Sequence, residues 1–224
     1  AFHTMIGLFS PAQMFKQAQT VFHMGAITGN PVRAGQAYMG ATLMQYLRWT
    51  NNPGIIKDFA KKAQKLGFGS ADEFEESYSA MMRSGIHSIE GENSLAGDAL
   101  DPKVFQSKMG TILDKGLVFW KMGDRFTRIS AWNIAFKEWK KVNPGKILTK
   151  REDINTVLSR ADDLTVNMTK ASSADIQKGI FSPVTQFWGY QMRLLEQMAG
   201  KKLTTGEKIR AWIMQSTMYG VPVG

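Results

Sequence analysis

The sequence predicts an all-α protein, an elongated array of amphipathic helices without a sheet. Apolar residues recur at spacings of three and four over long segments, which places them on one face of a helix. Serine, threonine, proline and glycine stand where these segments would begin and end. No segment alternates apolar and polar residues between turn signals, as a strand would.

Residues 1–83 form the first predicted region, a helical one that we describe as neutral because residues 1–100 carry no net charge. Its helices are expected over about 10–26, 32–49, 55–66 and 70–83. The second of these carries small residues that would let another helix approach closely: Ala34, Gly35, Ala37, Gly40 and Ala41. In the last, Ser70 and Glu73 have the spacing of a capping box, in which each side chain bonds the other residue's backbone N–H.

Residues 84–101 are polar and rich in glycine, and we expect a loop or hinge there. The charge changes at this point: residues 1–100 hold 8 Lys and Arg against 8 Asp and Glu, whereas residues 101–224 hold 20 against 11. The whole net charge of +9 therefore lies in residues 101–224, so the second predicted region, 102–224, is basic, and it is also rich in aromatic residues. Such a balance indicates contact with DNA, RNA, anionic lipid or an acidic protein, or else a solvated helix face.

A long aromatic helix is expected over about 117–142. Its apolar stripe steps by three and four residues through Phe119, Met122, Phe126, Ile129, Asn133 and Phe136. Trp132 and Trp139 widen this stripe. Asn133 would need a hydrogen-bond partner once buried, and such residues often set the register between helices or join a polar network in the core.

Three more helices are expected in the second region, over about 149–164, 182–199 and 204–217. Thr149 with Glu152, and Thr204 with Glu207, have capping-box spacing. The middle helix is again aromatic. The last helix carries Ile209, Trp212, Ile213 and Thr217.

Composition limits the classes of function. The chain has no cysteine, which excludes disulfides and cysteine-based metal sites. No run approaches the ~18 apolar residues of a membrane span. The 14 methionines suit either a surface that repacks against partners or an irregular core. Neither end looks like a natural terminus, so we expect a segment of a larger protein.

No catalytic constellation is visible. His3, His23 and His87 lie far apart, without metal-ligand spacing. Asp162 and Asp163 are paired carboxylates, which a solvated helix face explains better than acid–base chemistry. We therefore expect no catalytic residue, no cofactor and no metal, and a segment that is not an enzyme.

Five blocks of the second region, taken in order, resemble a known family. They are RISAWNIAF at 128–136, LSRADDLTVNMTK at 158–170, SPVTQFWGYQMR at 182–193, TTGEKIRA at 204–211 and YGVPVG at 219–224. The order resembles a segment of the very large internal virion proteins of short-tailed phages. This family includes ejection (internal core) proteins and giant proteins that carry a packaged RNA polymerase. The resemblance covers about residues 120–224, and the first hundred residues match nothing that we can name.

The resemblance implies storage inside the capsid near the portal, release into the host cell envelope, and help in building a conduit for the genome. The expected partners are the portal or other internal virion proteins, with genomic DNA and the host envelope as further contacts. The segment is expected to form part of a homo- or hetero-oligomer. Enzymatic domains of the family lie elsewhere in their chains, so no catalytic residue is carried over.

Trp, Tyr and Arg contribute most of the binding energy at protein interfaces. We expect partner contacts from such residues of the aromatic helices and of the last helix: Trp120, Arg125, Arg128, Trp132, Trp139, Phe187, Trp188, Tyr190, Arg193 and Trp212. Some of these must instead be core residues, and the sequence does not separate the two groups.

Three alternatives stay open. A non-catalytic region of a virion RNA polymerase would bind nucleic acid in a salt-dependent way. A peptidoglycan hydrolase would lose its activity on substitution of one glutamate, with Glu90 or Glu92 as the first to test. A module that lines a membrane would make liposomes leak.

Overall fold

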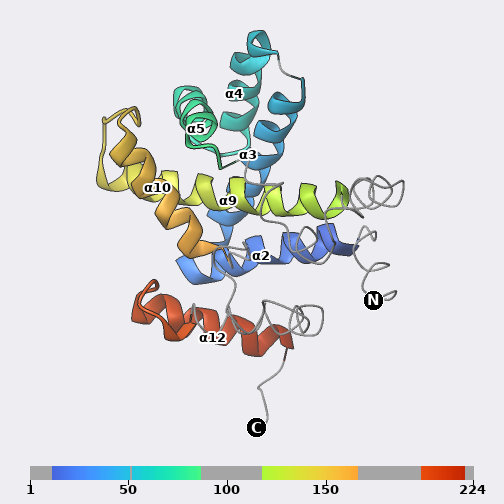
Figure 1. The fold of residues 1–224 in the computed structure, drawn as a ribbon, viewed down its shortest axis with the longest axis vertical. Helices are drawn as coiled ribbons and strands as arrows, with labels where there is room; N and C mark the ends of the chain where they lie inside the picture. Colours follow the sequence, from blue (N-terminus) through green and yellow to red (C-terminus); the bar gives the residue numbers. More distant parts are fainter. Residues whose placement is uncertain (1–11, 51, 87–117, 166–197, 220–224) are drawn as a thin grey trace, which may run out of the picture.

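The computed structural model describes residues 12–50, 52–86, 118–165 and 198–219 (Figure 1). These residues form seven α-helices and one short 3-10 helix, with no strand among them. The all-α prediction is confirmed. The elongated shape stays a prediction, because the described part has internal gaps. Most of the predicted loop at 84–101, and all but the end of the predicted helix at 182–199, lie outside the described residues.

Helices α2 (Ala12–Thr28) and α3 (Pro31–Thr50) are joined by two residues and pack on each other. The expected end of α2 near residue 26 is two residues too early, because Gly25 lies inside the helix. The helix ends instead at Gly29, whose φ of 69° is left-handed. A Cβ on Gly25 would lie 2.7 Å from that of Ala34, so glycine is what permits the close contact between the two helices.

The short η1 (Pro53–Ile55) leads into α4 (Ile56–Lys65) and then α5 (Ala71–Ser84). The predicted cap of α5 is confirmed in one half: Ser70 Oγ accepts the Glu73 N–H at 3.1 Å. The Glu73 carboxylate reaches elsewhere, to Lys137 Nζ at 3.0 Å. Gly85, with a φ of 72°, ends the helix.

The long helix α9 (Val118–Val142) lies at the centre of the described part, with α2, α3, α5 and α10 packed against it (Figure 1). Every residue from 129 to 136 is buried. The prediction of a single apolar face is therefore wrong for these two turns. All sides of the helix are buried there, because neighbouring helices surround it.

A buried polar network joins α9 to the first region, as the position of Asn133 within the apolar stripe predicted. The Asn133 Nδ2 donates to the Ala37 carbonyl at 3.2 Å, and its Oδ1 accepts from Ser77 Oγ at 3.2 Å. The Trp132 Nε1 donates to the Ser77 carbonyl and hydroxyl, at 3.3 and 3.2 Å. These bonds fix α9 in register against α3 and α5. Helices from both predicted regions thus share one core, and the hinge between the regions stays a prediction.

Helix α10 (Arg151–Leu164) buries Ile154, Val157, Ala161 and Leu164, which lie on one face, and Leu158 beside them is half-buried. Its predicted cap is wrong. Lys150 occupies the N-cap position and makes no side-chain cap, because the helix begins one residue later than a Thr149 cap requires. The last helix, α12 (Thr205–Tyr219), packs against α2.

Four of the five small residues of α3 serve the close helix packing that was expected: Ala34, Ala37, Gly40 and Ala41 are buried. A Cβ on Gly40 would lie 2.5 Å from the Phe68 ring. Gly35 differs, because it is exposed and a Cβ added there would meet nothing within 4 Å.

Candidate partner-docking surface

Helix α12 turns its more apolar side away from the protein. Ile209, Trp212 and Ile213 follow the three- and four-residue spacing of one helix face, and they are 55%, 43% and 62% exposed. The side that packs inward buries Glu207 and Ala211 instead. A helix at the surface of a self-sufficient domain normally has the opposite arrangement, with the apolar stripe toward the core. We call Ile209, Trp212 and Ile213 the outer face of α12.

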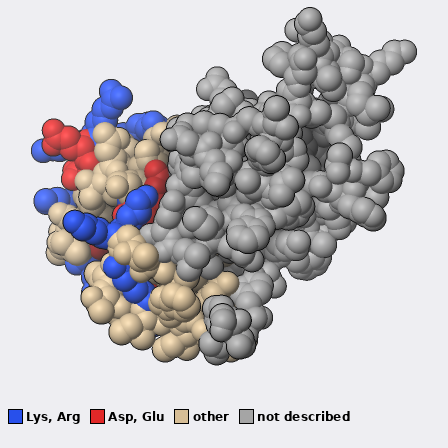
Figure 2. Space-filling model, turned by 60° about the horizontal axis from the view of Figure 1, so that its bottom comes forward, with Lys and Arg blue, Asp and Glu red and all other residues tan. Residues whose placement is uncertain are grey.

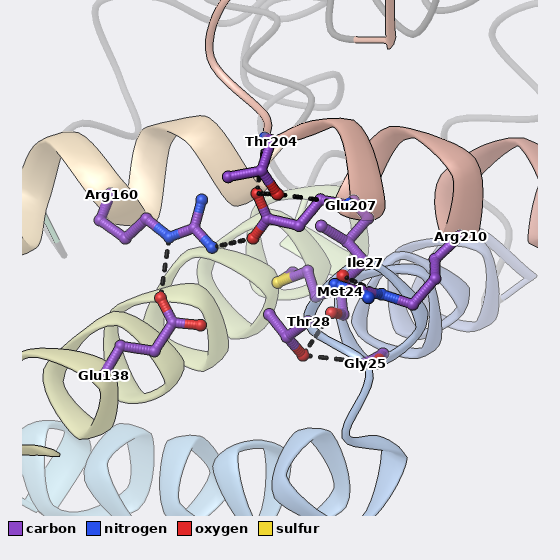
Figure 3. Close-up of polar contacts among 9 residues, drawn as sticks. All are labelled: Met24, Gly25, Ile27, Thr28, Glu138, Arg160, Thr204, Glu207 and Arg210. Carbon is purple, nitrogen blue, oxygen red and sulfur yellow. Dashed lines mark hydrogen bonds and ion pairs between the residues drawn. The ribbon is translucent and has the colours of Figure 1, made fainter.

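The predicted capping box at the start of α12 is present in both halves (Figure 3). The backbone N–H and the hydroxyl of Thr204 donate to Glu207 Oε2, at 2.9 and 3.0 Å, and the Glu207 N–H donates to Thr204 Oγ1 at 3.4 Å. This satisfies backbone donors that the first turn would otherwise leave without partners. The chain therefore fixes where α12 begins.

Arg160 of α10 ties α12 to the central helix. Its guanidinium lies between two carboxylates: Nε donates to Glu138 Oε2 of α9 at 2.8 Å, and Nη2 donates to Glu207 Oε1 of α12 (Figure 3). All three side chains are largely withdrawn from solvent. Three helices thus meet at one arginine, whose planar donors suit two carboxylates at once.

The pKa directions agree with this geometry. Burial alone would raise the pKa of the Glu207 carboxyl, but the hydrogen bonds from Thr204 and Arg160 outweigh it, so that the pKa lies below its ordinary value. Burial alone would lower the pKa of Arg160, and the hydrogen bonds to Glu138 and Glu207 raise it instead. Both groups are therefore charged at neutral pH.

A second contact holds the middle of α12 on the end of α2. The Arg210 Nε donates to the Ile27 carbonyl at 2.8 Å (Figure 3). The same nitrogen would lie 3.4 Å from a Cβ added to Gly29. The last carbonyls of a helix carry partial negative charge and lack partners within the helix, so an arginine there is favourable. Thr28 completes the helix end by donating to the Met24 carbonyl at 2.9 Å. The inward side of α12 is thus held by polar bonds, and Ile209, Trp212 and Ile213 remain exposed.

Part of the basic charge that indicated a polyanion is neutralised within the protein. Lys137 and Lys140 of α9 pair with Glu73 and Glu76 of α5, at 3.0 and 2.7 Å. The neutral and basic regions are therefore complementary to each other. On the described part of the face in Figure 2, Lys and Arg stand beside Asp and Glu and beside uncharged residues.

The structure separates several of the ten predicted contact residues into core and surface. Trp132 has no exposed surface and Trp139 has almost none, so both are core residues. Arg128 pairs with Asp124 at 2.8 Å. Burial and the nearby Arg48 lower the pKa of the half-buried Arg125 to about 10.

Of the remaining predicted contacts, Trp212 lies on the outer face of α12. The side chain of Trp120 lies outside the described part of the chain, as do Phe187, Trp188, Tyr190 and Arg193.

Sequence reasoning missed the residues that hold this face in place. The capping spacing revealed Glu207, but its pairing with Arg160 joins residues 47 apart in the chain, and no local pattern reports such a pair. Ile209 and Ile213 were assigned to the last helix without being counted as contacts. The spacing of Ile209, Trp212 and Ile213 shows in the sequence that they share one helix face. It does not show whether that face lies toward the core or toward solvent.

Within the described ranges, no group of three or more His, Asp and Glu residues is placed to hold a metal ion. Asp162 and Asp163 are half-buried, and burial raises the pKa of each. Burial lowers the pKa of His23. His87, Glu90 and Glu92 lie outside the described residues.

None of the described helices combines the length and the apolar character that a membrane crossing requires. Comparisons with protein-family models, with curated proteins and with solved structures found no match.

Proposed function

We propose that this chain is a structural segment of an internal virion protein of a short-tailed phage, and that it docks on the portal or on other internal virion proteins. The observation that carries the docking role is the reversed arrangement of α12, with Glu207 buried and Ile209, Trp212 and Ile213 exposed. The class of protein comes from the resemblance of residues 120–224.

Binding energy favours this use of the outer face. Moving one large apolar side chain from water into a packed interface contributes roughly 1.5–3 kcal/mol. Trp at the centre of a small apolar patch is the residue type that most often dominates an interface. The capping box and the two arginine contacts hold the patch in one position before binding, which lowers the entropy that association costs.

The place of action follows from the same proposal. The segment would sit inside the capsid near the portal, and it would enter the host cell envelope with the genome. It carries no reaction of its own. The ion pairs between α5 and α9 support protein docking over DNA binding for the described residues, because they neutralise basic charge that DNA contact would need.

The test is incorporation into particles. Trp212→Glu in the phage genome should lower the number of copies of this chain per purified particle at least tenfold, because a charge would be buried in the interface. Val142→Glu is the matched control, since Val142 is also apolar and is 79% exposed at the end of α9. Unchanged incorporation of Trp212→Glu would refute docking through α12, and absence of the wild-type chain from particles would refute the virion assignment.

A further inference from the structure

Helix α3 carries a stripe of exposed residues on the side that faces away from its buried residues. Its exposed positions between the two ends of the helix recur at spacings of three, four, three, four and three: Val32, Gly35, Met39, Thr42, Tyr46 and Trp49. This is the a and d spacing of a heptad seam. The opposite side is the buried one, with Ala34, Ala37, Gly40, Ala41, Met44 and Leu47.

The stripe is apolar or small at every position. Val32, Met39, Tyr46 and Trp49 are 69%, 40%, 47% and 83% exposed. The hydroxyl of Thr42 donates to the Tyr38 carbonyl at 3.0 Å, so its hydrogen-bonding need is met within the helix. Gly35 destabilises a helix interior relative to alanine, and the space beside it is empty. None of the described residues packs closely enough to require glycine there.

Antiparallel pairing of two such stripes gives that reason. In an antiparallel pair each a position faces a d position of the other helix, and here the two-fold axis falls between Met39 and Thr42. Val32 then faces Trp49, Gly35 faces Tyr46, and Met39 faces Thr42. Each layer places a larger side chain against a smaller one, which is the condition for close packing. We propose that α3 is a self-association surface, and that its occupant is the α3 helix of a second copy of this chain.

Charge supports the same occupant. A two-fold axis brings identical groups together, which is unfavourable for a chain of net charge +9. The stripe holds no charge. The positions that flank a and d hold none either: Pro31, Gln36, Tyr38, Leu43, Gln45 and Thr50. Self-pairing along α3 therefore brings no charged side chains of the seam together.

Helix α4 sets the salt dependence. It lies beside α3, where Phe59 stacks on Tyr46 with ring centroids 5.3 Å apart. Two copies of α4 would then lie on the same side of the pair, each with exposed Lys57, Lys61 and Lys65. Added salt screens their repulsion, so self-association should strengthen as salt rises. Binding to a polyanion would weaken instead.

The seam is short. Its 18 residues span about 27 Å of helix, or two and a half heptads. The dimer should therefore be weak and concentration-dependent, with a dissociation constant on the order of micromolar. This surface is separate from the outer face of α12, so the proposal stands or falls independently of the proposed function.

Because the chain contains no cysteine, engineered cysteines report the pairing without background. Full-length Val32→Cys and Trp49→Cys chains, carrying tags of different size, are mixed and oxidised. The antiparallel pair predicts a disulfide between the two different chains and little between identical ones, because like positions lie at opposite ends of the pair. Disulfides mainly between identical chains, or none at the highest soluble concentration, would overturn the proposal.

Sedimentation of single variants gives a second, independent readout. Met39→Lys places two lysines beside the two-fold axis and should weaken the dimer at least tenfold, while the exposed position keeps the fold intact by circular dichroism. Val142→Lys, at the end of α9, is the control and should dimerise like the wild type, because Val142 is also apolar and exposed but lies outside both proposed surfaces. A Met39→Lys chain that dimerises normally, or a wild-type monomer that binds anionic lipid vesicles instead, would contradict self-association through α3.

Discussion

Helices α9 and α12 both carry tryptophan among apolar and basic residues, but they use it in opposite ways. Trp132 of α9 lies in a fully enclosed section, and its indole N–H bonds Ser77. Trp212 of α12 faces outward, while the inward side of that helix is held by Glu207 and Arg210. Both helices carry polar anchors, but neighbouring helices enclose α9 between residues 129 and 136, whereas Ile209, Trp212 and Ile213 of α12 stay exposed. Aromatic content therefore does not tell a core helix from a docking helix, whereas the exposure of the aromatic and apolar side chains does.

The largest effect expected from this contrast is on stability. Trp132→Ala should lower the free energy of unfolding by about 3–5 kcal/mol, because it empties a packed site and removes the bonds to Ser77. Trp212→Ala should change it by no more than about 0.5 kcal/mol, because it removes a side chain at the surface. Urea unfolding of the two variants measures the difference. Similar losses in both would mean that α12 is packed like a core helix.

The polar anchor of α12 should come next in size. Glu207→Ala removes the partner of Arg160 and one half of the capping box, and it should lower the unfolding free energy by about 2–3 kcal/mol. Glu75→Ala, at a half-buried position of α5, is a control for loss of a carboxylate and should cost less than about 1 kcal/mol. If both cost the same, Glu207 does not anchor the helix.

Acid should release the same anchor. The folded state lowers the pKa of Glu207, so this carboxylate stabilises the protein above its ordinary pKa of 4.5, and the stabilisation is lost as pH falls through the lower folded value. Glu207→Gln should be less stable than the wild type at pH 6, and the gap should close as the pH is lowered below 4.5. A gap that stays constant with pH would show that ionisation of Glu207 does not matter.

The buried side of α2 should respond to pH at a higher range. Burial lowers the pKa of His23, so the unfolded chain takes up a proton more readily than the folded one. The contribution of neutral His23 to the free energy of unfolding should therefore have its full value above about pH 6.5. It should decrease as the pH drops from there toward the pKa of the folded state. His23→Gln should lose this part of the pH dependence. Thermal unfolding at pH 7.5 and pH 5.5 compares the two proteins.

The smallest effects should separate the two glycines of α3. Gly35→Ala adds a methyl group to open space in a helix and should raise the unfolding free energy of the monomer by about 0.5–1 kcal/mol. Gly40→Ala should lower it by about 1–3 kcal/mol, because the added carbon would overlap the Phe68 ring. Gains in both, or losses in both, would show that the two sides of α3 are not as different as their exposure indicates.

Helix spacing and end signals predicted the fold class and most helix bounds, because both are local. The caps at Ser70 and Thr204 were predicted for the same reason. The need of a buried Asn133 for a partner was predicted too, but its partners Ala37 and Ser77 lie far away in the chain and were not. The Thr149 cap failed, since one residue of shift at a helix start changes which side chain can reach the backbone. The anchoring of α12 was out of reach, because Glu138, Arg160 and Glu207 come together only through tertiary packing.

The central claim is that the outer face of α12 is covered by a partner protein in the assembled particle. A photo-cross-linking amino acid placed at position 212 of the phage-encoded chain tests this directly, with position 142 as the exposed control. Irradiated particles should yield a cross-link from position 212 to the portal or another internal virion protein, identified by mass spectrometry, and little from position 142. Equal yields at both positions, or cross-links from position 212 to this chain alone, would contradict the claim.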